Sequence, residues 1–482
     1  MIVTEEQLIE QARNVLDPYK TFNVTVRPFA PEQARPYAVA WTDADEGRGM
    51  RLSVSPTNVV TVPAVKAKRE GLTPGETSNL FARLVRRALG DEPESLFISL
   101  DGCLDVENAA NGIALGLLSP QIYKMRRDPD DYAGPKQIVL VHAKAAEADV
   151  QNAIAEGFFF GGLQNLQRWL GAQAPNVLTI GAFAQVARAL AQAFGGQVIE
   201  PTEDEYERMG LLQAVCRASG EKPRVIAIGS KIDAPVHAVV GKGMVMDTGG
   251  VSLKTPNANM LEMNADMMGA AAALGAALFF LQRPQARRHD TVYVLSIGVN
   301  DTGSRAYRPE DVLTGYDGQT VRVVNTDAEG RLALADAVSW ACERFHPERV
   351  TTIATLTGAA HSAFGDGMSA VMVRGNDLDL LEQAETVGED AGDEVNRLLM
   401  RDEDDKAMRD ERADLRNLAE KPARGAQTAA AFVFAHVPKG IEAVHLDIPR
   451  AASHGGSEEM GLAKGLPIGA GVSLLISLEI SS

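Results

Sequence analysis

Short β-type runs alternate with helical stretches along most of the chain, and this alternation restricts the fold more than any other feature. In the first 160 residues, the runs PYAVAW, RLSVS, SLFISL and QIVLVHA are interspersed with helical stretches such as NLFARLVRRALG. Later, the strand patterns QVIEP, RVIAIG and AVVGKGMVMD precede a long Ala-rich helical pattern. Strands alternating with helices are typical of βαβ units around a mostly parallel sheet. The sequence therefore predicts an α/β protein.

The length of 482 residues corresponds to about two to four domains at roughly 100–200 residues each. A helical stretch interrupted by Gly-Gly, at about 150–173, predicts the connection between two of them. We place an N-terminal α/β domain at 1–160 and a larger C-terminal domain at 161–482. The charged run RDEDDKAMRDERADLR at 401–416 predicts a solvated surface helix with ion pairs.

The charge and cysteine content exclude several classes of protein. There are 47 Lys plus Arg against 64 Asp plus Glu, a formal net charge of −17, and such a field repels nucleic acid and anionic membrane. Cys103, Cys216 and Cys342 lie far apart, which predicts reduced thiols and no disulfide framework. The acidic N-terminus does not resemble a signal peptide, and the apolar run Met267–Leu281 is shorter than the roughly 18 residues that span a bilayer. We expect a cytoplasmic protein without membrane partners.

The first candidate site is the string NTDAEGRLALADAVSWACERF at 325–345. Asp327 and Glu329 are two residues apart, so in extended backbone they point to one side and can share a divalent cation. The same acids also suit the first turn of a helix, because the macrodipole favours negative charge there. Considered without their neighbours, Asp327 and Glu329 are explained better by a helix start than by a metal site. Arg331 beside Gly330 weakens the helix-start interpretation, because a guanidinium at a helix N-terminus makes an anion pocket.

The second candidate site is the apolar strand that carries Lys242 and ends at Asp247, followed by a turn toward Lys254. A charged lysine in an apolar strand is costly unless its amine is neutral and binds a metal. Five residues separate Lys242 from Asp247, so a shared site requires a bulge, which the glycines flanking Lys242 could supply. A lysine that extends from a strand end to solvent explains the pattern equally well.

The third candidate is Asp266, which lies beside an apolar stripe at helical spacing. The stripe predicts a core helix, and a surface aspartate is the default interpretation of Asp266 by itself. The chain has no HExxH, GxSxG or GxxxxGK[ST] motif, and its eight histidines do not recur at ligand spacing; we expect His445 to lie in the core. A metal site here would therefore consist of carboxylates and an amine, which suits Zn²⁺, Mn²⁺ or Mg²⁺.

The octapeptide Asn325–Leu332 resembles the signature of the leucyl aminopeptidases of the M17 peptidase family, also called cytosol aminopeptidases. The similarity continues through GKGMVMDTGGVSLK, MLEMNADMMGAAAALG, AYRPEDVL, TIATLTGAAHSAFG, ADLRN and HLDI, over roughly residues 165–480. The resemblance implies a variable, macro-like N-terminal domain and a C-terminal catalytic domain whose mixed central sheet is flanked by helices. It also implies a homohexamer built as a dimer of trimers.

The resemblance further implies two divalent ions, Zn or Mn and possibly Co or Mg. One would be held tightly by Lys242, Asp247, Asp266 and Glu329. The other, more exchangeable, would be held by Asp247, Asp327 and Glu329 with the Asp327 carbonyl. Lys254 and Arg331 match the catalytic positions that do not bind metal. The residues implied to bind substrate are Met263, Asn325, Thr355, Leu356, Thr357 and Gly358.

The implied reaction is hydrolysis of the N-terminal peptide bond by a water that the two metals activate. Lys254 would polarise the scissile carbonyl, and Arg331 would hold a bicarbonate ion that acts as general base. The free amine of the peptide would bind a metal and Asp266, and Met263 would line a pocket for apolar, Leu- or Met-like first residues.

The sequence departs from the family pattern in three places. The loop TPNANM is one residue longer than usual, and Asn264 replaces a basic residue, which predicts a change on the outer face. Pro449 and Arg450 replace Ala-Gly near the first-residue pocket. Arg450 could therefore reach that pocket and favour polar or acidic residues, or it could point to solvent or to a neighbouring subunit.

The sequence is also compatible with two other functions. The protein could be a dinuclear hydrolase of another amide or of a phosphoester. It could instead be a DNA-binding regulator whose N-terminal domain presents Arg83, Arg86 and Arg87, although the net charge opposes this. A structural homologue without activity is disfavoured by the intact candidate positions.

Overall fold

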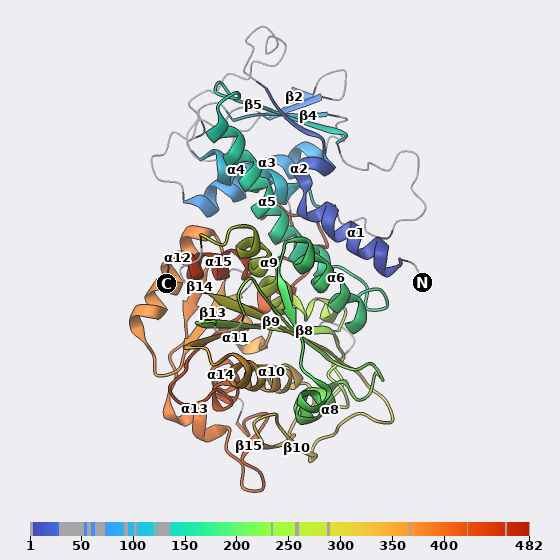
Figure 1. Ribbon diagram of the computed structural model, residues 1–482, viewed down its shortest axis with the longest axis vertical. Coiled ribbons are helices and arrows are strands. Elements are labelled where there is room, and N and C mark those ends of the chain that lie inside the picture. Colours follow the sequence, from blue (N-terminus) through green and yellow to red (C-terminus); the bar gives the residue numbers. More distant parts are fainter. Residues whose placement is uncertain are drawn as a thin grey trace. The chain divides into compact units, whose positions relative to one another are not determined.

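The computed structural model describes residues 3–27, 53–54, 59–62, 73–90, 95–100, 103, 105–119, 123, 135–232, 235–255, 260–286, 290–365, 368–421, 423–457 and 460–481. The chain divides into two compact units (Figure 1). Unit 1 comprises Met1–Ala12, Leu166–His454 and Pro467–Ser482, and unit 2 comprises Arg13–Asn165 and Gly455–Leu466. The predicted domains 1–160 and 161–482 are continuous, whereas each unit is built from separate segments of chain.

Unit 2 contains a five-stranded sheet in the order β1-β5-β4-β3-β2. All neighbouring strands are parallel except β2 and β3. The strands are β1 (Val24–Arg27), β2 (Ser53–Val54), β3 (Val59–Val62), β4 (Ser95–Ser99) and β5 (Gln137–Val141). The helices are α1 (Glu5–Leu16), which begins in unit 1, α2 (Pro18–Thr21), α3 (Pro74–Leu89), α4 (Val106–Gly116) and α5 (Ala148–Gly171), which continues into unit 1. The strands predicted from SLFISL and QIVLVHA are confirmed as β4 and β5, whereas PYAVAW lies outside the described residues.

Unit 1 is built on an eight-stranded mixed sheet in the order β14-β13-β16-β12-β8-β9-β7-β6. Its strands are β6 (Gln197–Ile199), β7 (Arg224–Gly229), β8 (His237–Asp247), β9 (Thr291–Asn300), β12 (Arg349–Ala354), β13 (Ser369–Val373), β14 (Val395–Arg397) and β16 (Glu442–Asp447). The four central strands, β16, β12, β8 and β9, are mutually parallel, and the antiparallel pairs lie toward the edges. The carboxyl ends of the central strands therefore meet at one edge of the sheet.

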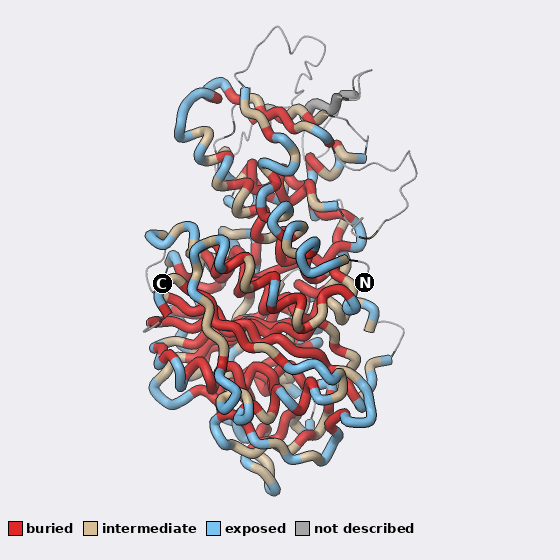
Figure 2. The backbone as a smooth tube through the Cα atoms, turned by 45° about the vertical axis from the view of Figure 1, so that its right-hand side comes forward, coloured by how far each residue is buried: buried red, intermediate tan, exposed pale blue. Residues whose placement is uncertain are grey.

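Helices cover both faces of this sheet, and the strands between them are almost entirely buried (Figures 1 and 2). Helices α6, α9 and α15 lie on one face and α8, α10 and α14 on the other. The helices of unit 1 are α6 (Ile180–Ala193), α7 (Glu203–Arg208), α8 (Gly210–Cys216), α9 (Met268–Gln282), α10 (Glu329–Phe345), α11 (Gly358–Phe364), α12 (Leu378–Ala391), α13 (Asp402–Ala407), α14 (Gly425–Ala435) and α15 (Val472–Ser481). Two 3₁₀ turns are η1 (Met263–Ala265) and η3 (Pro449–Ala452).

Helix α9 is the predicted apolar helix, and it is a core helix. The segment Met263–Gln282 is long and apolar enough to cross a membrane by length and composition, but 83% of its most apolar window is buried inside the protein. Gly241 of β8 lets α9 approach the sheet, because a Cβ there would lie 2.6 Å from the carbonyl oxygen of Gly269 and 2.7 Å from Cα of Ala270. The close contact between α9 and β8 holds the turn η1, which precedes α9, beside that strand.

Strand β8 contains the predicted irregularity between Lys242 and Asp247. Its register with β9 is regular from His237 to Met244 and then shifts before Asp247 pairs with Asn300. The bulge is therefore confirmed, but it follows Met244 and does not lie at the glycines beside Lys242.

The charged segment 401–416 is not one solvated helix, so that prediction is wrong. Helix α13 ends at Ala407, and β15 (Leu415–Arg416) pairs with β11 (Thr320–Arg322), which in turn pairs with β10 (Val312–Thr314). The Asp410 side chain is fully buried between Arg322 at 2.8 Å and Arg416 at 3.0 Å. The charges form tertiary ion pairs, and these replace the helical ion pairs that the local pattern predicted.

Candidate metal centre

Three buried carboxylates meet at the carboxyl edge of the central sheet. Asp247 ends β8, Asp266 follows η1, and Glu329 is the first residue of α10. Each offers an oxygen within 4.8 Å of the other two, and in the part of the chain that the structure describes no other group of this kind is found. Carboxylate oxygens at this spacing suit a hard or borderline divalent cation.

Lys242 lies directly beside this cluster and is 2% exposed. Its Nζ lies 2.8 Å from the Asp266 carboxylate and 3.0 Å from Glu329, and it donates to the Thr355 carbonyl at 2.9 Å. Gly330 leaves room for it, because a Cβ at Gly330 would lie 2.6 Å from that Nζ. The lysine therefore does not extend to solvent, and the signature glycine has a steric reason.

The charges of this cluster oppose one another strongly. Burial would lower the pKa of Lys242, but the carboxylates of Asp266, Glu329 and Asp247 raise it overall. Burial raises the pKa of Glu329, and repulsion from Asp247 raises it further. Glu329 Oε2 is also buried and accepts no hydrogen bond from any described residue. A buried carboxylate oxygen without a partner is costly. The donor set therefore fits a divalent cation, which would balance the carboxylate charges in place of the proton on the Lys242 amine.

A second lysine forms the outer side of the same site. Lys254 Nζ lies 2.9 Å from Asp247 and 2.5 Å from Asp327. The Asp327 side chain is 34% exposed, unlike those of the buried cluster. Burial raises the pKa of Asp327 while Lys254 lowers it, and the balance is a raised value. Asp247 therefore lies between an inner group with Lys242 and an outer group with Lys254.

Arg331, two residues after Glu329 on α10, is buried with one edge of its guanidinium free. Its Nη1 donates to the Asn417 carbonyl at 3.0 Å, whereas its Nε has no hydrogen-bond partner among the described residues. Burial lowers its pKa to about 10, so the group stays charged near neutrality. A buried guanidinium with an unused donor can hold a small anion.

The predicted substrate-binding segment 355–358 links β12 to α11, and Asp447 anchors it. Thr355 Oγ1 donates to Asp266 at 2.8 Å. The backbone N–H groups of Leu356 and Thr357 donate to Asp447 Oδ1 at 3.0 and 3.2 Å, and Thr357 Oγ1 donates to Oδ2 at 2.6 Å. Sequence reasoning missed Asp447, although an acid that ends the apolar run of β16 is a visible signal. Gly358 begins α11 next to this anchored segment.

Asn325 and Met263, the other predicted substrate contacts, occupy different parts of the site. Asn325 Oδ1 accepts from the Asp327 N–H at 2.8 Å, so this side chain shapes the turn that carries Asp327. Met263 starts η1, which contacts η3. Asn264 does not face outward as predicted, because its side chain donates to the carbonyls of Gly171 and Gln173.

Arg450 on η3 is buried and does not point to solvent. Its Nη2 lies 3.2 Å from Asp393 Oδ1, and Asp393 Oδ2 accepts from the N–H of Gly471 at 2.6 Å, just before α15. The guanidinium is committed to this buried ion pair, so the hypothesis that Arg450 selects polar first residues loses its physical basis. The longer loop TPNANM has residues 256–259 outside the described part of the chain.

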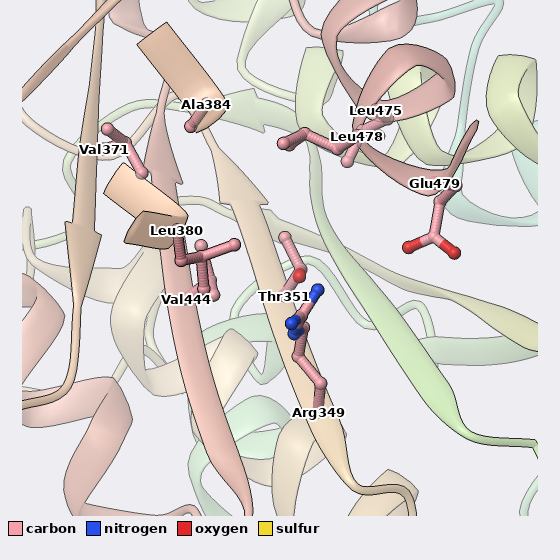
Figure 3. A pocket seen from close by; sticks show the side chains of 9 residues that line it. All are labelled: Arg349, Thr351, Val371, Leu380, Ala384, Val444, Leu475, Leu478 and Glu479. Atoms are coloured by element: carbon pink, nitrogen blue, oxygen red, sulfur yellow. The ribbon is translucent and has the colours of Figure 1, made fainter. Parts of the chain in front are cut away.

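Among the described residues, two of the cavities in unit 1 are lined by no residue of the cluster. The first, of about 20 Å³, lies among Leu380, Val444 and Leu475, with Arg349 and Glu479 at its margin (Figure 3). It has room for about one water molecule. The second, of about 430 Å³, is lined by Arg208, Tyr316, Cys342 and His436 among others.

Comparisons with known proteins identify the family. Residues 165–476 match the cytosol aminopeptidase family, catalytic domain (peptidase M17). The chain is 38% identical over 342 residues to a probable cytosol aminopeptidase of Alkalilimnicola ehrlichii, covering 69% of this chain and 67% of that protein. It is 37% identical over 362 residues to the cytosol aminopeptidase of Pseudomonas aeruginosa, covering 73% and 71%.

The solved structure of the bottromycin maturation enzyme BotP matches with a TM-score of 0.73 and 26% identity, over 95% of this chain and 98% of that one. This likeness confirms the predicted fold class, a two-domain α/β protein whose larger part has a mixed central sheet flanked by helices. The chain therefore belongs to the cytosol aminopeptidase (M17) family, whose members are metal-dependent aminopeptidases.

Proposed function

We propose that this protein removes the N-terminal residue from peptides with the help of two divalent cations. The observation that carries the proposal is the cluster of Asp247, Asp266 and Glu329 around the buried amine of Lys242. The inner cation would take Lys242, Asp247, Asp266 and Glu329, and the outer one Asp247, Asp327 and Glu329 with the Asp327 carbonyl. Zn or Mn fits this donor set, as do Co and Mg.

The bound cations would supply Lewis-acid chemistry, which acidifies water and polarises a carbonyl. The ammonium of Lys254 lies beside Asp247 and Asp327, on the outer side of the site. There it would stabilise the oxyanion that develops on the scissile carbonyl. Arg331 keeps a buried donor for an anion, and bicarbonate there would accept the proton of the attacking water. These roles use charges that the fold holds in place before substrate binds.

The restriction to N-terminal residues follows from the acidity of the inner site. A free α-amine would bind beside Asp266, whose carboxylate is held by Lys242 and Thr355. An internal peptide bond or an acetylated terminus has no such amine. Met263 on η1, next to η3, supplies a flexible apolar wall, which supports a preference for Leu- or Met-like first residues.

The test combines metal analysis with hydrolysis of leucyl and methionyl peptides by wild type and Asp327→Ala. We expect two metals per chain in wild type, one retained metal in the variant, and loss of most activity. Asp379→Ala, which removes an exposed carboxylate on α12, is the matched control and should change neither. Unaltered metal content and activity in Asp327→Ala would refute the assignment. Hydrolysis of N-acetylated peptides at a similar rate would favour a hydrolase of other amides.

The remaining expectations are a homohexamer, a cytoplasmic location and no use of nucleic acid. The relatives' name supports the location. Of the three arginines of α3 that could bind DNA, Arg83 and Arg87 are exposed. Arg86 instead donates to the carbonyls of Gly116 and Leu118, and this weakens the DNA-binding alternative. Light scattering tests the hexamer, and a salt-sensitive mobility shift would revive the DNA-binding alternative.

A further inference from the structure

The turn that carries Asp327 has an unusual distribution of hydrogen bonds. Residues 325–328 contribute four consecutive backbone carbonyls immediately before α10. The Thr326 carbonyl accepts from the Tyr307 hydroxyl at 2.7 Å and from Asn300 Nδ2 at 3.0 Å. Asn417 Nδ2 donates to the other two flanking carbonyls, that of Asn325 at 2.6 Å and that of Ala328 at 3.3 Å. No described residue donates a hydrogen bond to the Asp327 carbonyl.

Asn417 makes the largest contribution to this arrangement, from a segment that follows β15. It is fully buried, and its Oδ1 accepts from the N–H groups of Val324 at 2.7 Å and Asn325 at 3.3 Å. Its backbone carbonyl accepts from Arg331 Nη1 at 3.0 Å. One residue therefore holds the start of the turn, its end and the catalytic arginine candidate.

This pattern has a physical consequence for a ligand. An irregular turn has no strand or helix ladder to fix its dihedral angles, so side-chain hydrogen bonds must do so. With the flanking carbonyls occupied, the Asp327 carbonyl is the one left to bind another group. Replacing a residue that hydrogen-bonds to a metal ligand and orients it commonly lowers the metal affinity by about 10–100-fold.

We propose that Asn417 is a positioning residue for the outer metal ion. It holds the turn 325–328 so that the carbonyl and the carboxylate of Asp327 face the site together, and it places Arg331 through its own carbonyl. Tyr307 and Asn300 assist at the Thr326 carbonyl. This inference rests on the proposed function, because it requires an outer cation at Asp327.

The test is a metal titration without substrate, in which purified protein is stripped of metal and competes with a fluorescent chelator for Zn²⁺. Asn417→Asp keeps the acceptor at Oδ1 and removes the two donated bonds. Its added negative charge by itself would tighten cation binding, so weaker binding would have to come from the lost donors. We expect the larger of the two dissociation constants, that of the more weakly bound outer ion, to rise by about 10–100-fold. The tighter one should change less, because three of the four residues proposed to hold that ion, Lys242, Asp247 and Asp266, lie on other segments, and only Glu329 follows this turn.

Asn165→Asp is the matched control, since it makes the same substitution at a buried asparagine of unit 2 that donates to the Ala114 carbonyl. It should leave both constants unchanged. If Asn417→Asp does not fold, Tyr307→Phe keeps the ring and removes one donor, and it should weaken the same constant by up to about tenfold.

Each outcome separates the two proposals. Wild type that binds fewer than two Zn²⁺ ions overturns the proposed function. Wild type with two ions and a folded Asn417→Asp with unchanged constants overturns the positioning role, as does an unchanged Tyr307→Phe if Asn417→Asp is unfolded. Equal weakening of both constants would make Asn417 a general structural residue and would also overturn the role.

Discussion

The close contact between β8 and α9 can be tested by Gly241→Ala. The new Cβ would lie 2.6 Å from the Gly269 carbonyl oxygen, whereas ordinary contacts begin near 3.4 Å, so the two elements must separate by about 0.8 Å. The three nearest atoms all belong to the backbone of α9, so no side chain can rotate away. Overpacking of this kind costs about 1–3 kcal/mol, and removing a glycine from a strand offsets up to about 1 kcal/mol. We expect a net loss of about 1–2 kcal/mol in the free energy of unfolding.

The same displacement should reach the metal centre. Asp266 lies three residues before Gly269, and its carboxylate is 2.8 Å from Lys242 Nζ. A shift of about 0.8 Å carried to Asp266 would stretch that contact to about 3.6 Å, beyond a normal hydrogen bond. Gly241→Ala should therefore weaken the binding of the proposed inner cation, in contrast to Asn417→Asp, which should weaken the binding of the outer one.

Urea unfolding of the metal-free protein and the Zn²⁺ competition titration measure the two effects. Gly181→Ala in α6 is the control, because its Cβ would meet nothing closer than 3.8 Å and alanine favours the helix by up to about 1 kcal/mol. If Gly241→Ala unfolds within about 0.5 kcal/mol of wild type and binds the tighter metal normally, the close contact does not position Asp266.

Three further substitutions test individual contacts. Gly330→Ala should displace the Lys242 amine and lower metal content, measured by elemental analysis, while the protein remains folded. Burial, with a smaller effect of Arg331, lowers the pKa of His445 to about 3. Below pH 6.5, the ordinary pKa of histidine, the unfolded chain therefore binds a proton that the folded protein does not. The free energy of unfolding is lost as the pH falls from about 6.5 toward 3. In urea unfolding, His445→Gln should remove about 2 kcal/mol of the stability loss between pH 7 and pH 5. Arg450→Met should cost about 3 kcal/mol by leaving Asp393 without this partner, with the preference among leucyl, methionyl and aspartyl amides unchanged; a changed preference would restore the specificity hypothesis.

Local patterns predicted much of unit 1 correctly. The strands of QVIEP, RVIAIG and AVVGKGMVMD, the core helix after Met267 and the need for a bulge between Lys242 and Asp247 are all present. These features depend on backbone periodicity and on the steric needs of neighbouring residues, which a sequence shows directly. The prediction of a surface helix at 401–416 was wrong because it used only the local charge pattern. Asp410 pairs with Arg322, which lies nearly ninety residues away in the sequence.

For the site, the sequence supplied the residue types and left each one with an ordinary alternative. Asp327 and Glu329 suited a helix start, Lys242 a strand end and Asp266 a surface, and no local pattern could choose among these. The structure brings Lys242 within 3.0 Å of Asp266 and Glu329, and it places Lys254 between Asp247 and Asp327. Arg450 shows the opposite outcome, since a position next to the site in sequence proved to face Asp393.

The α/β class, the family signature and the chemistry available to the chain all follow from the sequence. The polar groups that hold the site together become visible only in the folded chain. Asn417, Asp447 and Asn300 all act on residues of other elements, and Asn417 contacts a turn 92 residues earlier in the chain. Strand order and register bring such residues together, and neither is encoded by the spacing of neighbouring side chains. The candidate ligands could therefore be proposed from the sequence, whereas the residues that position them could not.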